Sequence, residues 1–284
     1  MATQSEIESL IFLLDDPDPE VQSGVQNRFR QLGERAVPLL DQYRTDIRDK
    51  QEREMVDDIL HSITFSALYE DFNDLLKEGI DSRESLEKAV FLLARFGNPT
   101  LRIEDYMRKL DRFTAEVEHE VLSRPEESHR MHSLLKFIFR ELRFRGDNKD
   151  YHNPENAFMD RVIDHRKGLP ISLSLIVMFI SRRLRLPFYG VNMPIHFMLI
   201  FEGSTREVLI DPFDGGTVVT YDQCHYFLKK NGIKPRPEHM RRAPEHEILA
   251  RSIRNLMHSY IRLEKEERAN NLQSLLNLVE LRGG

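Results

Sequence analysis

The sequence contains a single cysteine, no tryptophan and no apolar run long enough to cross a bilayer. One thiol, Cys224, cannot form an internal disulfide or a cysteine-based zinc site, and it fits a reducing compartment. The longest apolar stretch, residues 173–180, is interrupted by Ser174 and is far shorter than the roughly 18 residues of a membrane span. The first residues show no basic segment followed by an apolar one, so no secretory signal is expected. These absences predict a soluble, cytoplasmic protein without a membrane partner.

Acidic and basic side chains are unevenly distributed along the 284 residues. The net charge is −6, but residues 1–100 carry 21 acidic against 11 basic side chains, whereas residues 101–284 carry 26 against 30. An acidic N-terminal part does not favour binding to a phosphate backbone. The basic segment 234–242 lacks interleaved aromatic side chains that would stack on bases. Nucleic acid is therefore not an expected partner.

Residues 1–80 show the apolar spacing of successive helices. Ile7, Leu10, Ile11 and Leu14 recur at intervals of three and four residues, which places them on one helix face. An Asp- and Pro-rich turn follows, and Gly33 ends a second apolar stripe. A third helix begins with Ala-Val-Pro-Leu-Leu. This order resembles a HEAT-type helical repeat, although only one clear unit is visible.

The rest of the chain mixes helices with short strands. Helices are expected at 81–96, 101–122, 125–142, 170–184, 221–230, 246–264 and 266–281. Strands are expected at 188–193, 197–202 and 207–210, with a hairpin-like turn at Gly203 and Ser204. The sequence therefore predicts an α+β fold that is mostly helical and contains a small antiparallel sheet.

Three features that carry chemistry coincide in residues 151–216. A helix begins at Gly168-Leu169-Pro170, His196 stands at the start of a strand, and Asp211 ends the following strand. In papain-like and transglutaminase-like hydrolases a helix N-terminus lowers the pKa of a thiol, a histidine accepts its proton, and an aspartate holds the imidazole. The order of elements is the same here.

The residues at these positions closely resemble the SirB family of bacterial transglutaminase-like proteins. The resemblance covers roughly residues 60–284 and rests on Tyr151, Pro154, Asn156, Arg161, Val162, Arg166, Gly168, Pro170–Ser174, Gly190, Val191, Pro194, His196, Phe197, Ile210–Phe213, Gly215 and Gly216. It implies a papain-like core at 81–232, a helical tail resembling tetratricopeptide helices at 233–284, and a HEAT-like region at 1–80 outside the family pattern. It also implies that His196 and Asp211 correspond to the transglutaminase histidine and aspartate. Proline, at position 170, replaces the expected nucleophilic cysteine.

Each candidate site residue also has a purely structural interpretation. The His196–Asp211 pair either retains a role in binding or catalysis or ties two strands together. Ser172 is either a replacement nucleophile or a first-turn hydroxyl that satisfies a free N–H group. Further residues either line a groove facing His196 or form turns, caps and surface ion pairs; these are Asn153, Asn156, Arg166, Gly168 and Pro170.

The function expected first is a non-catalytic, transglutaminase-like protein that holds a peptide or protein partner in the former substrate groove, with a regulatory role. The alternatives are a hydrolase or acyl-transferase that uses Ser172, and a helical scaffold with an inert core. No cofactor is expected. No metal is expected either, because His129 and His132 beside Glu126 are more typical of a solvated helix face than of a ligand set.

Overall fold

The computed structural model describes residues 4–14 and 16–282. Contacts divide the chain into two units. The first comprises Met1–Asp74 with Leu92–Leu101, and the second comprises Leu75–Phe91 with Arg102–Gly284. The division falls inside two helices, α4 (Lys50–Glu78) and α5 (Arg83–Ala94), each of which contributes residues to both units.

The secondary structure of the first unit consists of helices and turns in its described residues. Besides the first part of α4 it contains α1 (Gln4–Phe12), α2 (Pro19–Leu32), the 3-10 turn η1 (Gly33–Ala36) and α3 (Val37–Asp46). The predicted turn before α2 and the predicted end of α2 at Gly33 are both present. Asp18 caps α2 by accepting the N–H of Glu20 at 2.9 Å, and Gly33 ends it with a φ of 59°, a backbone region that favours glycine.

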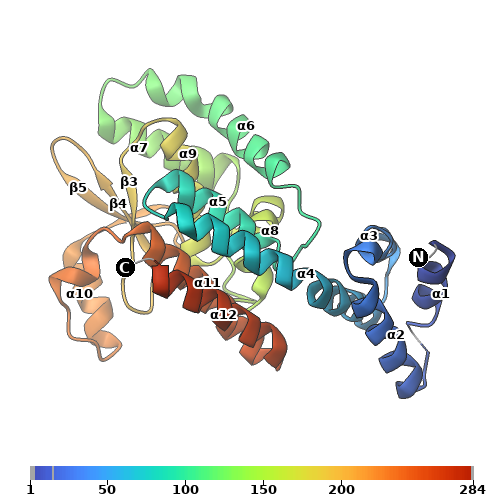
Figure 1. Ribbon diagram of the computed structural model, residues 1–284. Coiled ribbons are helices and arrows are strands. Elements are labelled where there is room, and N and C mark those ends of the chain that lie inside the picture. The colour runs from blue at the N-terminus through green and yellow to red at the C-terminus, as the bar shows by residue number, and fades with distance from the viewer. Residues whose placement is uncertain (1–3, 15, 283–284) are drawn as a thin grey trace. The chain divides into compact units, whose positions relative to one another are not determined.

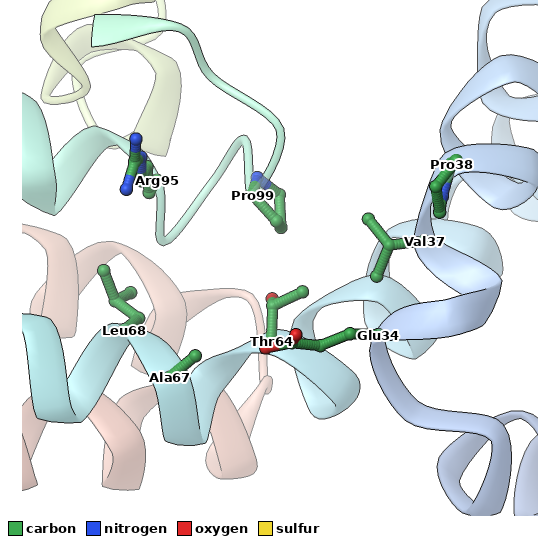
Figure 2. Close-up of a pocket in the computed structure, with 8 residues that line it drawn as sticks. All are labelled: Glu34, Val37, Pro38, Thr64, Ala67, Leu68, Arg95 and Pro99. Atoms are coloured by element: carbon green, nitrogen blue, oxygen red, sulfur yellow. The ribbon is translucent and has the colours of Figure 1, made fainter.

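A hollow of about 300 Å³ lies on the surface of this first unit. Figure 2 shows it between the start of α3, the middle of α4 and the turn that follows Arg95. Its lining is mainly apolar, with one carboxylate and one guanidinium. The lining residues are Glu34, Val37, Pro38, Thr64, Ala67, Leu68, Arg95 and Pro99.

The second unit is built around α9 (Pro170–Arg183). Twelve of its fourteen residues are buried, which explains why its sequence is apolar on all sides. Besides the end of α4 and most of α5, its helical elements are α6 (Ile103–Leu122), α7 (Glu127–Lys136), the π-helical turn η2 (Phe137–Glu141), η3 (Pro154–Asn156), α8 (Met159–His165), α10 (Tyr221–Lys230), η4 (Pro237–Met240), α11 (Glu245–Arg262) and α12 (Glu266–Arg282). Helices α6, α8 and α11 pack against α9, and α11 lies side by side with α12 (Figure 1).

The sheet beside α9 is an antiparallel meander in the order β3-β4-β5-β6. Its strands are β3 (Phe188–Val191), β4 (Met198–Glu202), β5 (Glu207–Asp211) and β6 (Thr217–Val219). Because side chains alternate along a strand, Met198, Ile200 and Leu209 share one face, where α10 covers them with Cys224 and Leu228. The opposite face packs on α9. A separate parallel pair joins β1 (Arg145–Gly146) to β2 (Lys167–Gly168) just before α9 begins.

The predicted α+β class is confirmed, and three of the four sheet strands lie where the sequence placed them. Strand β6 was not predicted. Its three residues leave two side chains exposed, so the hydrophobic alternation that marks a strand is missing. Within the described residues, no helix is both long enough and apolar enough to cross a membrane.

Candidate functional site

His196 sits in the loop between β3 and β4, two residues before β4 begins. The N–H of His196 donates to the carbonyl oxygen of Met193 at 3.2 Å, which closes a turn with Pro194 and Ile195 at its centre. Ile195 has a φ of 67°. A β-branched residue is rarely found there, since its Cβ crowds the backbone at a cost of about 1–2 kcal/mol. Strain of this kind is concentrated at functional sites.

The imidazole of His196 is hydrogen-bonded to the carboxylate of Asp211. The distance from Nε2 to Oδ2 is 2.9 Å, and the two side chains are 16% and 20% exposed. The predicted pairing is therefore confirmed. A carboxylate only accepts hydrogen bonds, so Nε2 carries the proton and a neutral ring presents Nδ1 as an acceptor. No hydrogen bond from Nδ1 to another described residue occurs in the structure. This nitrogen is the position from which a base would act.

The second carboxylate oxygen of Asp211 holds the turn after β5. Oδ1 accepts the backbone N–H groups of Phe213 at 2.9 Å and Asp214 at 3.3 Å. The turn directs the Phe213 ring toward His196. The two rings are arranged edge to face, with their centroids 6.5 Å apart. Asp211 therefore fixes both the histidine and the aromatic ring beside it.

Phe213 also connects the histidine to the start of α9. A side chain at Gly146 would place its Cβ 2.6 Å from the Phe213 ring, so the ring lies directly on that glycine. Gly146 pairs with Gly168, two residues before Pro170. The beginning of α9 and His196 are thus joined through Gly146 and Phe213.

Two further aromatic side chains flank this arrangement. The Tyr151 ring packs edge to face on Phe213 at 5.8 Å, and the Phe227 ring lies 6.0 Å from the His196 ring. Burial raises the pKa of Tyr151, an effect that the charge of Arg251 partly opposes. The guanidinium of Arg251 donates to the side-chain oxygen of Asn192 at 3.0 Å. It thereby ties α11 to the loop that carries His196.

Ser172 is a capping residue in this structure. Its side chain is 1% exposed. The hydroxyl donates to the carbonyl oxygen of Asn156 at 2.7 Å and accepts the N–H of Leu169 at 2.8 Å. Both partners are backbone groups, and the structure contains no hydrogen bond between Ser172 and His196. A serine used in this way lacks the base that a nucleophile requires.

Asn153 and Asn156 shape the loop before α8. Asn153 caps η3 by accepting the N–H of Glu155 at 3.0 Å. Asn156 is buried, donates to the carbonyl oxygen of Asp150 at 2.7 Å, and offers its own carbonyl to Ser172. The structure thus brings Asn156 and Ser172 together, and it shows the two asparagines acting as turn and cap residues.

Two of the other predicted groove residues lie at the entry to α9, and the third does not. Pro170 occupies the first turn of the helix, as predicted. Gly168 is required there, because a Cβ would lie 2.7 Å from the hydroxyl oxygen of Ser172. Arg166 lies elsewhere, with its guanidinium over the rings of Phe113, at 4.5 Å, and Phe144, at 4.6 Å.

Cys224 is on α10, and its thiol is buried against the sulfur of Met198 at 3.9 Å. Burial raises the pKa of this thiol, and the nearby charge of Asp211 raises it further. The protonated form is therefore favoured, which makes the sulfur a poor nucleophile. Among the described residues, no group of three or more His, Cys, Asp or Glu side chains is arranged to hold a metal ion.

Sequence reasoning did not assign roles to Ile195, Tyr151, Phe213 and Phe227. Tyr151 and Phe213 lay within the family motifs, so a signal was available for them. Ile195 carried a weaker signal, since proline followed by one residue and a histidine is compatible with a tight turn. Phe227 had no signal in the sequence, because its contact with His196 joins two distant elements.

The fold and this site define a class: an α+β protein in which a buried helix, a histidine and an aspartate follow one another as in papain-like and transglutaminase-like enzymes. A model of the transglutaminase-like superfamily matches residues 104–254, just over half of the chain. The chain therefore belongs to the transglutaminase-like superfamily.

Several curated proteins are similar over part of the chain. A UPF0162 protein of Vibrio cholerae is 28% identical over 195 residues, which cover 68% of this chain and 72% of that protein. A UPF0162 protein of Pseudomonas aeruginosa is 32% identical over 152 residues, or 53% and 55% of the two chains. Human F-box only protein 21 is 36% identical over 99 residues, which are 32% of this chain and 16% of that protein. No solved structure matches the chain.

Proposed function

We propose that the protein binds a peptide or protein partner on the surface around His196 and carries out no thiol chemistry there. The observation that carries this proposal is a retained histidine–aspartate pair beside a helix that opens with Pro170 instead of a nucleophile. The chain's one thiol, at Cys224, is buried, and burial raises its pKa. Binding of a partner can use the histidine–aspartate pair but does not need a nucleophile.

The side chains around His196 are of the kind that peptide-binding surfaces use. Ile195 is 53% exposed, Phe227 38% and Tyr151 37%. Single exposed apolar residues are ordinary on protein surfaces, but these three belong to elements that meet near one polar pair. Aromatic side chains are enriched in binding surfaces. The free Nδ1 of His196 adds an acceptor for a backbone N–H group of the partner.

Finer assignments accompany this proposal. We place the chain in the SirB family, with a HEAT-like N-terminal region and a tetratricopeptide-like tail formed by α11 and α12, and we propose a cytoplasmic, regulatory protein. The similarity to a stretch that makes up 16% of human F-box only protein 21 supports a segment used as a module in larger proteins. The serine-hydrolase alternative lacks support, since the Ser172 hydroxyl is occupied by backbone groups.

A peptide selection tests the binding proposal. Random peptides displayed on phage are selected on the immobilised full-length chain, and the Kd of each selected peptide is measured for variants. Ile195→Asp is the informative variant, since aspartate tolerates a positive φ and adds a charge to the proposed surface. Ile261→Asp is the matched control, because Ile261 is 57% exposed on α11. We expect about a ten-fold or larger loss of affinity for the first variant and little change for the second. Equal affinities of both variants would refute the proposal.

Burst kinetics with activated acyl esters test the absence of catalysis. We expect no burst with the native chain, with Ser172→Ala or with His196→Ala. A burst that both substitutions abolish would establish the serine enzyme instead. A burst that only Cys224→Ser abolishes would show that the buried thiol reacts, and it too would overturn the non-catalytic assignment.

A further inference from the structure

A second pocket lies on the α10-covered face of the sheet, at the end away from His196. Glu202 ends β4 and pairs in register with Glu207, which begins β5. Asp211 is at the other end of β5, four residues and therefore about 13 Å along the strand. The pocket holds about 600 Å³ and is lined by Ile200, Glu202, Glu207, Tyr221, His225, Pro235, Arg236, Pro237, Met240, Arg241 and Arg242.

The basic segment singled out in the sequence forms one wall of this pocket. Three arginines and one histidine line it, against two carboxylates. Both carboxylates already have partners, because Glu202 lies 3.7 Å from Arg242 and Glu207 accepts from the hydroxyl of Tyr221 at 3.3 Å. Like charges opposite one another on adjacent strands are unfavourable. The contacts with Arg242 and Tyr221 offset the repulsion between Glu202 and Glu207.

The other polar side chains of the pocket have few partners. Arg241 has only a long contact of 3.9 Å with Glu247. No ion pair or side-chain hydrogen bond links the guanidinium of Arg236 or the imidazole of His225 to another described residue. The pocket therefore presents two guanidinium groups with few partners, and one imidazole, to an incoming ligand.

The rest of the lining is apolar. Met240 and Ile200 are buried, at 5% and 3% exposed, and the remaining apolar lining comes from Pro235, Pro237 and the Tyr221 ring. The volume falls within the range of about 300–1,000 Å³ typical of small-molecule sites, which combine an apolar lining with a few polar groups. We propose that this pocket binds a small organic oxyanion, a carboxylate or a phosphate carried on a compact apolar body.

Isothermal titration of the full-length chain with four probes tests this proposal. Phenylacetate and phenyl phosphate represent the two oxyanions, and 2-phenylethanol and benzylamine are neutral and cationic controls. We expect one-to-one binding of at least one anion and no measurable binding of either control. Binding of only one anion identifies the oxyanion that the pocket prefers. Failure of both anions to bind at millimolar concentration, or equal binding of 2-phenylethanol, would overturn the proposal.

Two charge-matched variants and a methyl signal locate the bound anion. Arg236→Gln should weaken binding about ten-fold, since it removes a charge-assisted hydrogen bond. Lys234→Gln removes the same charge from an exposed position of the same segment that does not line the pocket, and it should change the affinity less than about two-fold. Methyl-labelled methionine NMR should show a shift at Met240 on binding and none at Met55. Equal losses for both variants, or an unshifted Met240 signal, would refute this site.

Discussion

Removal of the Glu87 charge should destabilise the second unit strongly. Glu87 is 0% exposed, yet it is a carboxylate inside the packing of α5 against α9. Oε2 accepts from Arg182 and Arg183, and Oε1 accepts from Arg183, all at 2.8 Å. Arg183 also donates to Asp111 at 2.7 Å. The buried glutamate therefore neutralises two guanidinium groups at the end of α9.

The expected magnitude follows from what the substitution leaves behind. Burial alone would lower the pKa of Arg183, but the hydrogen bonds and charges of Glu87 and Asp111 outweigh it and raise the pKa. Loss of one partner of a buried pair costs about 3–5 kcal/mol. Glu87→Gln keeps one accepting oxygen, so we expect a loss near the lower end, about 3 kcal/mol. For a unit of about 200 residues this lowers Tm by about 6–12 °C.

Urea and thermal unfolding, followed by far-ultraviolet circular dichroism, measure this loss. Hydrogen exchange of the α9 amides reports on the second unit separately, since a chain of two units need not unfold in one step. The matched control is Glu84→Gln, one turn earlier on α5, with a side chain that is 58% exposed and 3.9 Å from Arg182. It should cost less than about 1 kcal/mol. If Glu87→Gln costs no more than this control, the buried ion-pair network does not stabilise the unit.

The remaining predictions concern three residues near the candidate site. Ser172→Ala should lower the free energy of unfolding in urea by about 1–2 kcal/mol, because it leaves backbone groups at the start of α9 without a hydrogen-bond partner. An unchanged midpoint of urea unfolding would contradict the capping role. Cys224 should react slowly with iodoacetamide in the native state and rapidly in urea, since burial, followed by the Asp211 charge, raises its pKa; rapid native alkylation would show an accessible thiolate. Burial favours a raised pKa for Asp147, but the N–H groups of Asp150 and Lys149 and the charge of Lys167 bring it below its usual value. The Asp147 carboxylate should therefore stabilise the fold above about pH 4 and lose this contribution as the pH falls through the lower folded pKa. In Asp147→Asn, the free energy of unfolding should fall less steeply as the pH is lowered through this range.

The elements that the sequence predicted well are those with local signals. The start of α9 could be predicted because two residues there have local structural causes. Gly168 allows a close approach of the Ser172 side chain, and Pro170 suits the first turn of a helix. Strands β3, β4 and β5 could be predicted from short apolar runs separated by turn residues. Asp211 lies at the end of β5, as predicted, and His196 lies in the loop two residues before β4, close to the predicted strand start. In each case the physical cause lies within a few residues along the chain.

The parts that could not be read depend on contacts between distant segments. Helix 125–142 was predicted as continuous, whereas α7 ends at Lys136 and a π-helical turn follows. The contact of Arg166 with two aromatic rings depends on α6 and on the segment after that turn. The positive φ of Ile195 conflicts with the local preference of isoleucine, so only the surrounding structure can impose it. Local propensity cannot reveal such positions, because tertiary contacts override it there.

The geometry of Asp211 shows what holds the His196–Asp211 pair in place. One carboxylate oxygen orients the His196 ring, and the other holds the turn that places Phe213. Phe213 in turn packs on Gly146, beside the strand pair that leads into α9. Loss of the aspartate would therefore release an aromatic contact as well as a hydrogen bond. The strained turn at Ile195 argues in the same direction for function, since a pair kept only to join two strands does not require a backbone conformation that costs about 1–2 kcal/mol. The cost of holding His196 in this position therefore supports the proposed binding surface.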